Sequence, residues 1–439
     1  MSVFRSVPIG AVCLLYAAML SAAPVTHPSS PVAPLPTALA SSPLQAAVRR
    51  IWQTSPEVQA ARADLDAAQA RARAAAQPLY NPSLSLDAEN ADVNRRTAGI
   101  SLPLDLSGKR RARASQGEAD LRAAEAAYNL VRRDVAARWL KAWSTAALAA
   151  RQSELGQRRL TLMQRFDDLA AQRLKVGDIS SPERDLAGLA LGEAQVQQAT
   201  LASNEAAARA ELLAISGDQL TALPPLPAGM PPVVGSVTPL PVDELPELRQ
   251  SRAQQASAEA GVQVARRARI PDPTLSLTGG QVRSGPRTDQ VIGLSVSIPL
   301  PVLNTGRAEV EAARAEADAA AAGVRSRQFV LRAGLQEAQA RYAALRGAAE
   351  AFRTGRAAAF EDRTALLEKL WRAGEISTSD YLVQLKQSLD TALSGQELES
   401  QAWQAWFDYL TAAGRLNDWL DGRTQDGPTQ DSLNQDIPR

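Results

Sequence analysis

Hydrophobic and polar residues alternate with a period of two in two separate parts of the chain. The pattern is clearest over Ser83–Asp87 in the first part, and over Thr274–Thr278 and Ile292–Ile298 in the second. Such alternation is typical of β-strands with one oily and one polar face. The sequence therefore predicts two β-hairpins, over residues 82–106 and 273–300, with polar connections at residues 90–96 and 279–289.

A proline-free run of about 65 residues follows each hairpin, and within it the apolar residues take a helical period. Alternating spacings of three and four, as over Leu121–Val135, are typical of coiled-coil seams. A continuous helix of this length spans roughly 100 Å, which is too long for a compact domain. We expect one helix before the first hairpin, over residues 44–78, long helices over residues 109–174 and 307–373, and shorter ones over residues 183–216 and 380–413.

The same order of elements occurs twice, and short motifs recur at matching places. Asn81-Pro82-Ser83-Leu84-Ser85-Leu86 returns as Asp272-Pro273-Thr274-Leu275-Ser276-Leu277, and the turn Val176–Ser180 returns as Ala373–Ser377. Each unit is far longer than a solenoid repeat of ~20–50 residues. The chain is therefore interpreted as a tandem duplication, with repeats over residues 44–217 and 244–414 and a proline-rich linker over residues 218–243.

The N-terminal segment has the features of an export signal. Arg5 precedes an apolar run over Ile9–Leu20, and Ser21-Ala22-Ala23 offers a small-residue cleavage site. The run is shorter than the roughly 20 residues that a spanning helix needs. We expect residues 1–23 to be a signal peptide, residues 24–43 a Pro/Ser-rich leader and residues 415–439 a polar tail. Cys13, the only cysteine, lies inside the apolar run, so no disulfide or lipid anchor is expected in the mature chain.

The composition of the chain argues against nucleic-acid binding, metal binding and catalysis. The chain has 48 basic and 47 acidic residues, so it carries no basic excess for holding nucleic acid. His27 is the only histidine, and without a mature cysteine the sequence offers no His/Cys set for zinc or copper. No nucleophile–base set or phosphate loop is present either. We expect no enzymatic activity and no cofactor.

The alternating strands fit two structures, half-buried strands on a soluble core or strands of a transmembrane barrel. Four isolated strands among such long helices favour the barrel. Four strands cannot close a membrane barrel alone, because about 8 are needed and no edge can face lipid. Oligomerisation is therefore expected. The alternative from another class is a non-porous secreted coiled-coil scaffold in which the hairpins pack on one another.

Taken together, the signal peptide, the duplicated helix–hairpin–long helix–turn–helix units and the repeated Gly-acid-Ile-Ser turns resemble the TolC-type outer membrane factors, the outer membrane efflux proteins. The resemblance covers about residues 44–415. The segment from Ser101-Leu102-Pro103-Leu104 to Gly108-Lys109-Arg110-Arg111-Ala112-Arg113 is most similar to the CzcC-like heavy-metal branch.

The resemblance implies a mostly α fold with a small β-barrel. Three chains would contribute four strands each to one 12-stranded barrel in the outer membrane, continued by a barrel of long helices across the periplasm. It further implies a passive exit duct of a tripartite RND-type efflux system, working with a periplasmic adaptor and an inner-membrane RND pump and passing divalent heavy-metal cations. A drug-efflux or type I secretion duct of the same fold remains an alternative.

Two sets of site residues follow from the resemblance. The first set faces lipid from the strands: Leu84, Leu86, Ile100, Leu102, Leu275, Leu277, Ile292, Leu294 and Val296. The second set contacts the adaptor at the periplasmic tip: Val176, Gly177, Asp178, Ile179, Ser180, Ala373, Gly374, Glu375, Ile376 and Ser377. We also hypothesise that Asp178, Glu375 and Asp380 form a cation-favouring ring at the tip, with helix capping as the alternative role.

Overall fold

The computed structural model describes residues 43–216, 224–226, 229–355 and 360–421. The described residues all belong to one compact unit, Ser41–Arg439. The expected signal peptide and leader lie outside the described residues, apart from Pro43, as does the tail beyond residue 421.

Each repeat consists of helices that flank one hairpin. The first repeat contains α1 (Pro43–Thr54), α2 (Pro56–Ala75), β1 (Ser83–Glu89), β2 (Val93–Pro103), α3 (Lys109–Lys175) and α4 (Ser181–Ser216). The second contains α5 (Pro246–Ala268), β3 (Thr274–Ser284), β4 (Arg287–Ser297), α6 (Arg307–Thr354), α7 (Phe360–Arg372) and α8 (Thr378–Ala412). Short helices η1 (Val234–Ser236) and η2 (Val242–Glu244) lie between the repeats, and α9 (Leu416–Leu420) follows them.

The helix expected over residues 44–78 is divided in two. It breaks at Ser55, whose backbone is extended (ψ 122°), and α2 starts at Pro56. Proline has no backbone N–H and is tolerated in the first turn of a helix but not inside one. Pro56 therefore sets the break, and the other proline of this segment, Pro78, stands at its end.

The second long helix is also shorter than expected over residues 307–373. α6 ends at Thr354, Gly355 is extended (φ −78°, ψ 176°), and α7 begins at Phe360. Glycine is a poor helix former, and here it caps α6 by donating to the carbonyls of Ala351 and Phe352. α3 continues through Gly156, and α6 itself continues through Gly323, Gly334 and Gly347, so a glycine alone does not end these helices.

The strands extend into the segments expected as hairpin connections. β2 begins at Val93, and β3 and β4 leave only Gly285 and Pro286 between them. Polar residues pair across these outer parts of the sheet, as Glu89 does with Arg95. Opposite charges that face each other across two strands stabilise the pairing, so the polar segments continue the strands instead of ending them.

The main core lies where both repeats meet. α3 packs against α2, α4, α5 and α8, and α6 packs against α5 and α8. Trp139 and Trp143 of α3 stack with ring centroids 6.1 Å apart, and Tyr342 of α6 lies 5.0 Å from Trp406 of α8. The proline-rich segment between the repeats adds Leu226 to this core.

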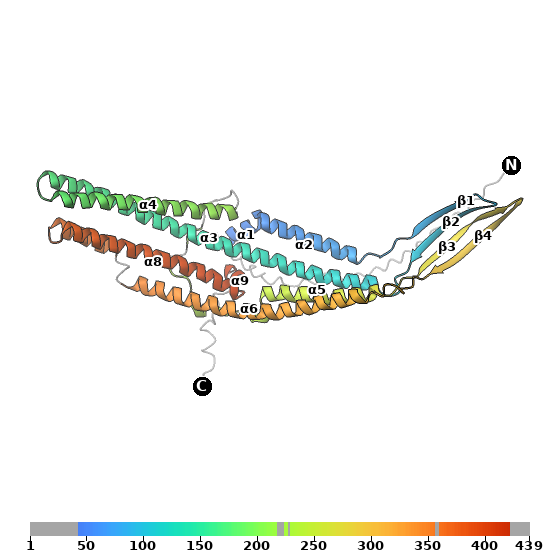
Figure 1. Cartoon of the computed structure of the whole chain (residues 1–439). Coiled ribbons are helices and arrows are strands. Elements are labelled where there is room, and N and C mark those ends of the chain that lie inside the picture. The colour runs from blue at the N-terminus through green and yellow to red at the C-terminus, as the bar shows by residue number, and fades with distance from the viewer. Residues whose placement is uncertain (1–42, 217–223, 227–228, 356–359, 422–439) are drawn as a thin grey trace, which may run out of the picture. The chain divides into compact units, whose positions relative to one another are not determined.

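A second, smaller core lies near the turns that join α3 to α4 and α7 to α8. Phe166, Trp371 and Tyr381 form a ring cluster with centroid separations of 4.6–5.4 Å. Figure 1 shows these turns at the end of the helices opposite the sheet. The sheet and the two turns are therefore the two ends at which this unit can present functional surfaces.

Candidate functional site: the sheet and the helical tips

The four strands form one antiparallel sheet in the order β1-β2-β3-β4. Because the strand period is two, the register decides which residues share a face. One cross-strand row contains Leu84, Ile100, Leu277 and Leu294. The neighbouring rows on this face add Leu86 and Ile292 on one side and Leu102, Leu275 and Val296 on the other. The register thus brings all nine strand residues predicted from the sequence onto one face.

This apolar face is uncovered. Relative exposure runs from 36% at Leu102 to 87% at Ile292. Contiguous apolar patches of this kind mark contact with another protein or with a membrane.

The opposite face carries small polar residues and is concave. Ser83, Ser101, Ser276 and Ser295 form one row, in which the hydroxyls of Ser83 and Ser101 lie 2.6 Å apart. In the next row, a Cβ added to Gly99 would lie 2.8 Å from Thr278 Cγ2 and 2.9 Å from Ser85 Oγ. Side chains converge here from both neighbouring strands, so the sheet curls around its polar face.

An acidic residue joins the two repeats where the sheet meets the helices. Asp272 is 8% exposed and accepts hydrogen bonds from Lys109 Nζ at 2.8 Å and Tyr80 Oη at 2.5 Å. The bond to Asp272, and then burial, raise the pKa of Tyr80 above 10.0. This contact was not predicted from the sequence. The available signal was the acidic Asp272 at the position that Asn81 takes in the first repeat.

The two tip turns have the same backbone design. Gly177 and Gly374 both adopt left-handed conformations, with φ of 76° and 77°. In the first turn, Asp178 N donates to Arg173 O and Gly177 N to Leu174 O, the pattern of a Schellman cap, and the same pattern recurs around Gly374. Most of the predicted tip residues are exposed, with Val176 at 79%, but Ile179 and Ile376 pack on the second core.

Two of the three carboxylates proposed for a cation ring have local partners. Asp178 forms an ion pair with Arg173 at 3.5 Å, and Asp380 accepts a hydrogen bond of 2.7 Å from Ser377 Oγ at the start of α8. Asp380 thus takes part in the cap of α8, whereas the contact of Asp178 is a local ion pair at the end of α3. The guanidinium of Arg173 also lies 4.6 Å from the ring centroid of Trp371, which links the two tips. No sequence signal pointed to that cation–π contact.

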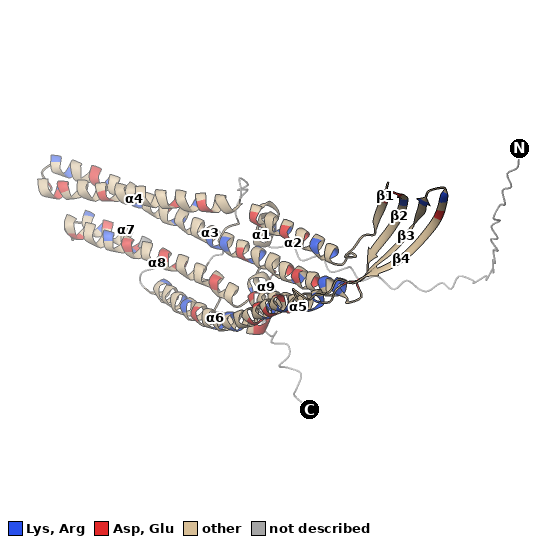
Figure 2. Ribbon diagram, turned by 45° about the vertical axis from the view of Figure 1, so that its right-hand side comes forward, with Lys and Arg blue, Asp and Glu red and all other residues tan. Residues whose placement is uncertain are grey.

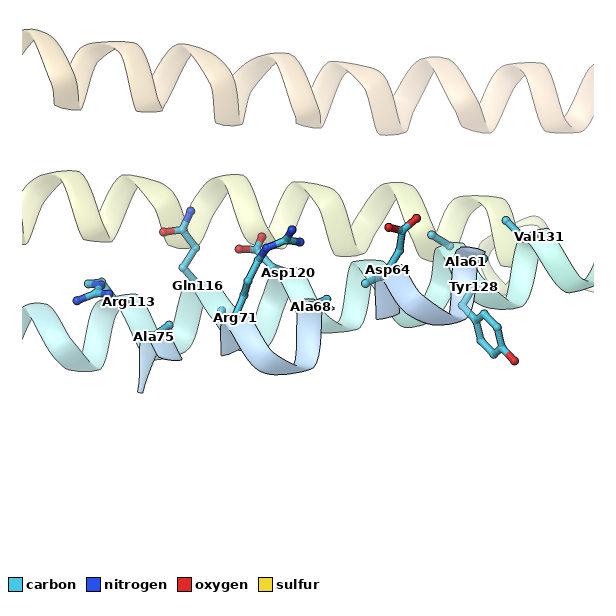
Figure 3. Close-up of a pocket in the computed structure, with 13 residues that line it drawn as sticks. Ala61, Asp64, Ala68, Arg71, Ala75, Arg113, Gln116, Asp120, Tyr128 and Val131 are labelled. Carbon is cyan, nitrogen blue, oxygen red and sulfur yellow. The ribbon is translucent and has the colours of Figure 1, made fainter. Parts of the chain in front are cut away.

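A groove runs between α2 and α3. It has a volume of about 580 Å³, and its lining combines small residues, such as Ala68, Gly117 and Ala124, with charged and polar side chains. Figure 3 shows Asp64, Gln116 and Asp120 of its polar rim directed toward α5. A small-residue groove of this kind lets another helix approach closely.

In the part of the chain that the structure describes, none of the helices is both long and apolar enough to cross a membrane. Among the same residues, no group of three or more His, Cys, Asp or Glu side chains is placed to hold a metal ion.

A duplicated helical unit with one curled four-stranded sheet, apolar outside and polar inside, defines a TolC-like channel protein. Residues 47–218 and 243–415 match the outer membrane efflux protein family, and the chain belongs to that family. Its members are outer membrane channels with a long helical periplasmic part and are not enzymes. Family membership therefore confirms the fold class and location expected from the sequence and excludes the non-porous scaffold.

Two proteins with similar sequences and one solved structure are consistent with membership of this family. The chain is 27% identical over 250 residues to the cobalt-zinc-cadmium resistance protein CzcC of Cupriavidus metallidurans, covering 54% of this chain and 58% of that protein. It is 29% identical over 258 residues to the nickel-cobalt-cadmium resistance protein NccC of Alcaligenes xylosoxydans xylosoxydans, covering 54% and 55%. The chain thus spans somewhat more than half the length of both. The CmeC outer membrane channel of Campylobacter jejuni superimposes with a TM-score of 0.71 at 14% identity, covering 88% of this chain and 89% of that one.

Proposed function

We propose that this protein is a homotrimeric exit duct of an RND-type efflux system and that its cargo is divalent heavy-metal cations. The observation that carries the duct is the single curled sheet with an apolar convex face, a serine-rich concave face and two unpaired edges, β1 and β4. In a membrane barrel the apolar face contacts lipid and the polar face lines a water-filled lumen. Closing the edges against other copies satisfies their backbone groups.

The helical layer supports the same assembly. α2, α3, α5 and α6 contact one another in that order, so α2 and α6 are its edges. The small-residue groove between α2 and α3 offers a seat for a helix of a neighbouring copy. Three copies would contribute 12 strands, above the about 8 that the smallest membrane barrels need.

The cargo is proposed from the relatives. CzcC and NccC are named for resistance to cobalt, zinc, cadmium and nickel. The duct would pass these ions as cargo through a lumen of hydroxyl groups, without holding them. Its two tip turns, Val176–Ser180 and Ala373–Ser377, would contact a periplasmic adaptor that couples the duct to an inner-membrane pump.

The proposal is tested in two steps. Purified full-length protein in planar bilayers should give discrete ion-conducting steps, and a strain without the protein should lose tolerance to cadmium, cobalt and zinc while keeping its tolerance to drugs. Loss of drug tolerance instead would assign the drug-efflux alternative, and export of a protein would assign type I secretion. An absence of conductance would overturn the duct.

The tip proposal has its own test. Val176→Asp should abolish metal tolerance while leaving conductance intact, because an exposed apolar contact would be replaced by a charge. Val233→Asp is the matched control, since Val233 is also exposed (60%) but lies before η1. Equal tolerance in both variants would remove the adaptor contact from this turn.

A further inference from the structure

The junctions between the sheet and the long helices expose large apolar side chains. After β4, Leu300 is 76%, Val302 77% and Leu303 99% exposed, and after β2, Leu106 is 75% exposed. Together with Ile298 (56%), they continue the apolar face of the sheet toward the helices. An uncovered apolar patch of this extent calls for a partner surface.

These side chains project from ordered loops. Val302 N donates to Leu300 O at 2.9 Å, and Leu106 N donates to Leu104 O at 3.0 Å, which places a three-residue turn at each junction. Two arginines at the end of α5 hold the loops in place: Arg267 donates to Ser107 O at 3.1 Å, and Arg269 donates to Thr305 O at 2.9 Å. The fold of the junction thus exposes these side chains on the single chain.

Basic residues follow directly on the helix side. The first turn of α3 contains Lys109, Arg110 and Arg111 and no acid, whereas the first turn of α6 contains both Arg307 and Glu309. Lys109 is paired with Asp272. Arg110, Arg111 and Arg307 are exposed, and within the described residues they have no ion pair.

At the start of α3, this placement of basic residues works against helix stability. The N-terminus of a helix carries a partial positive charge, so cations in the first turn are unfavourable there. Asp105 accepts the backbone N–H groups of Lys109 and Arg110 but leaves the guanidinium groups unpaired. Figure 2 shows basic residues at the ends of the helices that adjoin the sheet. An external anion would offset this repulsion.

We propose that the junction is a lipid-docking surface that binds anionic phospholipid headgroups in the leaflet facing the helices. The order along the molecule matches that of a membrane interface, with the apolar strand face first, then Leu106, Val302 and Leu303 at the acyl boundary, then arginines at headgroup level. Charge complementarity and continuity with the apolar sheet face select lipid as the occupant. The inference rests on the proposed membrane position of the sheet.

The first experiment measures where the loop lies. In a Cys13→Ser background the chain has no other cysteine, so Leu294→Cys, Leu303→Cys and Val330→Cys each take a single fluorophore. The full-length protein is placed in nanodiscs containing spin-labelled lipid. Lipid should quench the labels at positions 294 and 303, and should spare the label at position 330 on α6.

The outcomes separate the two proposals. Quenching at position 294 without quenching at position 303 overturns the docking surface and leaves the membrane barrel intact. A lack of quenching at both positions overturns the membrane position of the sheet, and the docking surface with it.

The second experiment tests the charge. Quenching at position 303 by phosphatidylglycerol should exceed that by phosphatidylcholine. The variant Arg110→Gln/Arg111→Gln/Arg307→Gln should remove this preference, and each charge removed should lower the relative affinity for the anionic lipid by about five-fold. The control triple Arg325→Gln/Arg327→Gln/Arg332→Gln removes equal charge from exposed positions along α6 and should keep the preference. If the junction variant keeps the preference for phosphatidylglycerol, lipid is not the occupant. If its subunits dissociate instead, the surface is a contact between copies and lipid is again overturned as the occupant.

Discussion

At the scale of single residues, the tip glycines provide a test in which only the backbone changes. Gly177 has a left-handed φ of 76°, and a Cβ added there would meet nothing within 4 Å. Gly177→Ala should therefore destabilise the tip by about 1–2 kcal/mol through backbone strain alone. Gly192 lies inside α4 with equally open space, so Gly192→Ala should instead stabilise by about 0.5–1 kcal/mol. Thermal unfolding of the two variants in detergent should shift in opposite directions.

A shift of the same sign in both variants would contradict this account. Gly374→Ala provides the second check, because Gly374 repeats the conformation with φ of 77°. Its effect should match that of Gly177→Ala within a few tenths of a kcal/mol.

The tip also contains a pH-dependent cap at the start of α4. Glu183 accepts hydrogen bonds from the backbone N–H and the hydroxyl of Ser180, both at 2.8 Å, and these two bonds lower the pKa of Glu183 below 4.5. A carboxylate with a depressed folded-state pKa stabilises above its unfolded pKa, and this stabilisation is lost as the pH falls through the folded-state value. Hydrogen exchange in the first turn of α4 should therefore accelerate as the pH falls below about 4.5, after correction for intrinsic rates.

Glu183→Gln should remove most of that acid dependence. Asp185→Asn is the control, because Asp185 is exposed on the same turn and makes none of these contacts. If the two variants show the same pH profile, the capping contact does not produce the dependence.

The sequence was sufficient for these tip features and insufficient for others at the same scale. Gly177 and Ser180 are local signals, since a glycine ends one helix and a serine three residues before Glu183 starts the next. The contact of Arg173 with Trp371 joins residues almost two hundred positions apart. Spacing along the chain carries no information about such a pair.

At the scale of elements, two adjacent glycines of β3 test the curvature of the sheet. A Cβ at Gly280 would lie 2.1 Å from the carbonyl oxygen of Arg96, whereas one at Gly279 would meet nothing nearer than 3.9 Å. Gly280→Ala should therefore destabilise the sheet by about 1–3 kcal/mol, and Gly279→Ala should be nearly neutral. The measurement is the yield of folded protein in outer membranes. Equal yields would show that the concave face can accommodate an added methyl group at Gly280.

The period-two pattern predicted the strand faces because every apolar strand residue had a partner in register. It located the ends of the strands less well, because polar residues such as Glu89 and Arg95 pair across the sheet without any alternation of hydrophobicity. Helix breaks were missed for a related reason. Gly355 ends α6, whereas Gly323, Gly334 and Gly347 lie inside the same helix, so the residue type alone does not mark a helix end.

At the scale of the whole molecule, the two repeats are held together by contacts that the duplication alone did not reveal. Arg133 of α3 pairs with Glu247 of α5 at 2.5 Å, with both side chains about nine-tenths buried. The repeats therefore form one unit, and the free edges of its sheet are β1 and β4.

The closing of the sheet edges gives the last prediction. β1 and β4 run antiparallel to each other, so β4 of one copy can pair with β1 of the next and continue the alternation. Oxidation of the Ser85→Cys/Ser295→Cys variant should give one covalent species of three times the chain mass. Placing the second cysteine at Ser297 or Asp289 instead tests other registers between β4 of one copy and β1 of the next. Ser101→Cys/Ser276→Cys joins neighbouring strands within a chain and should leave its mass unchanged. A ladder extending beyond three copies would mean that the edges join an open filament, because only a closed ring stops the addition of copies.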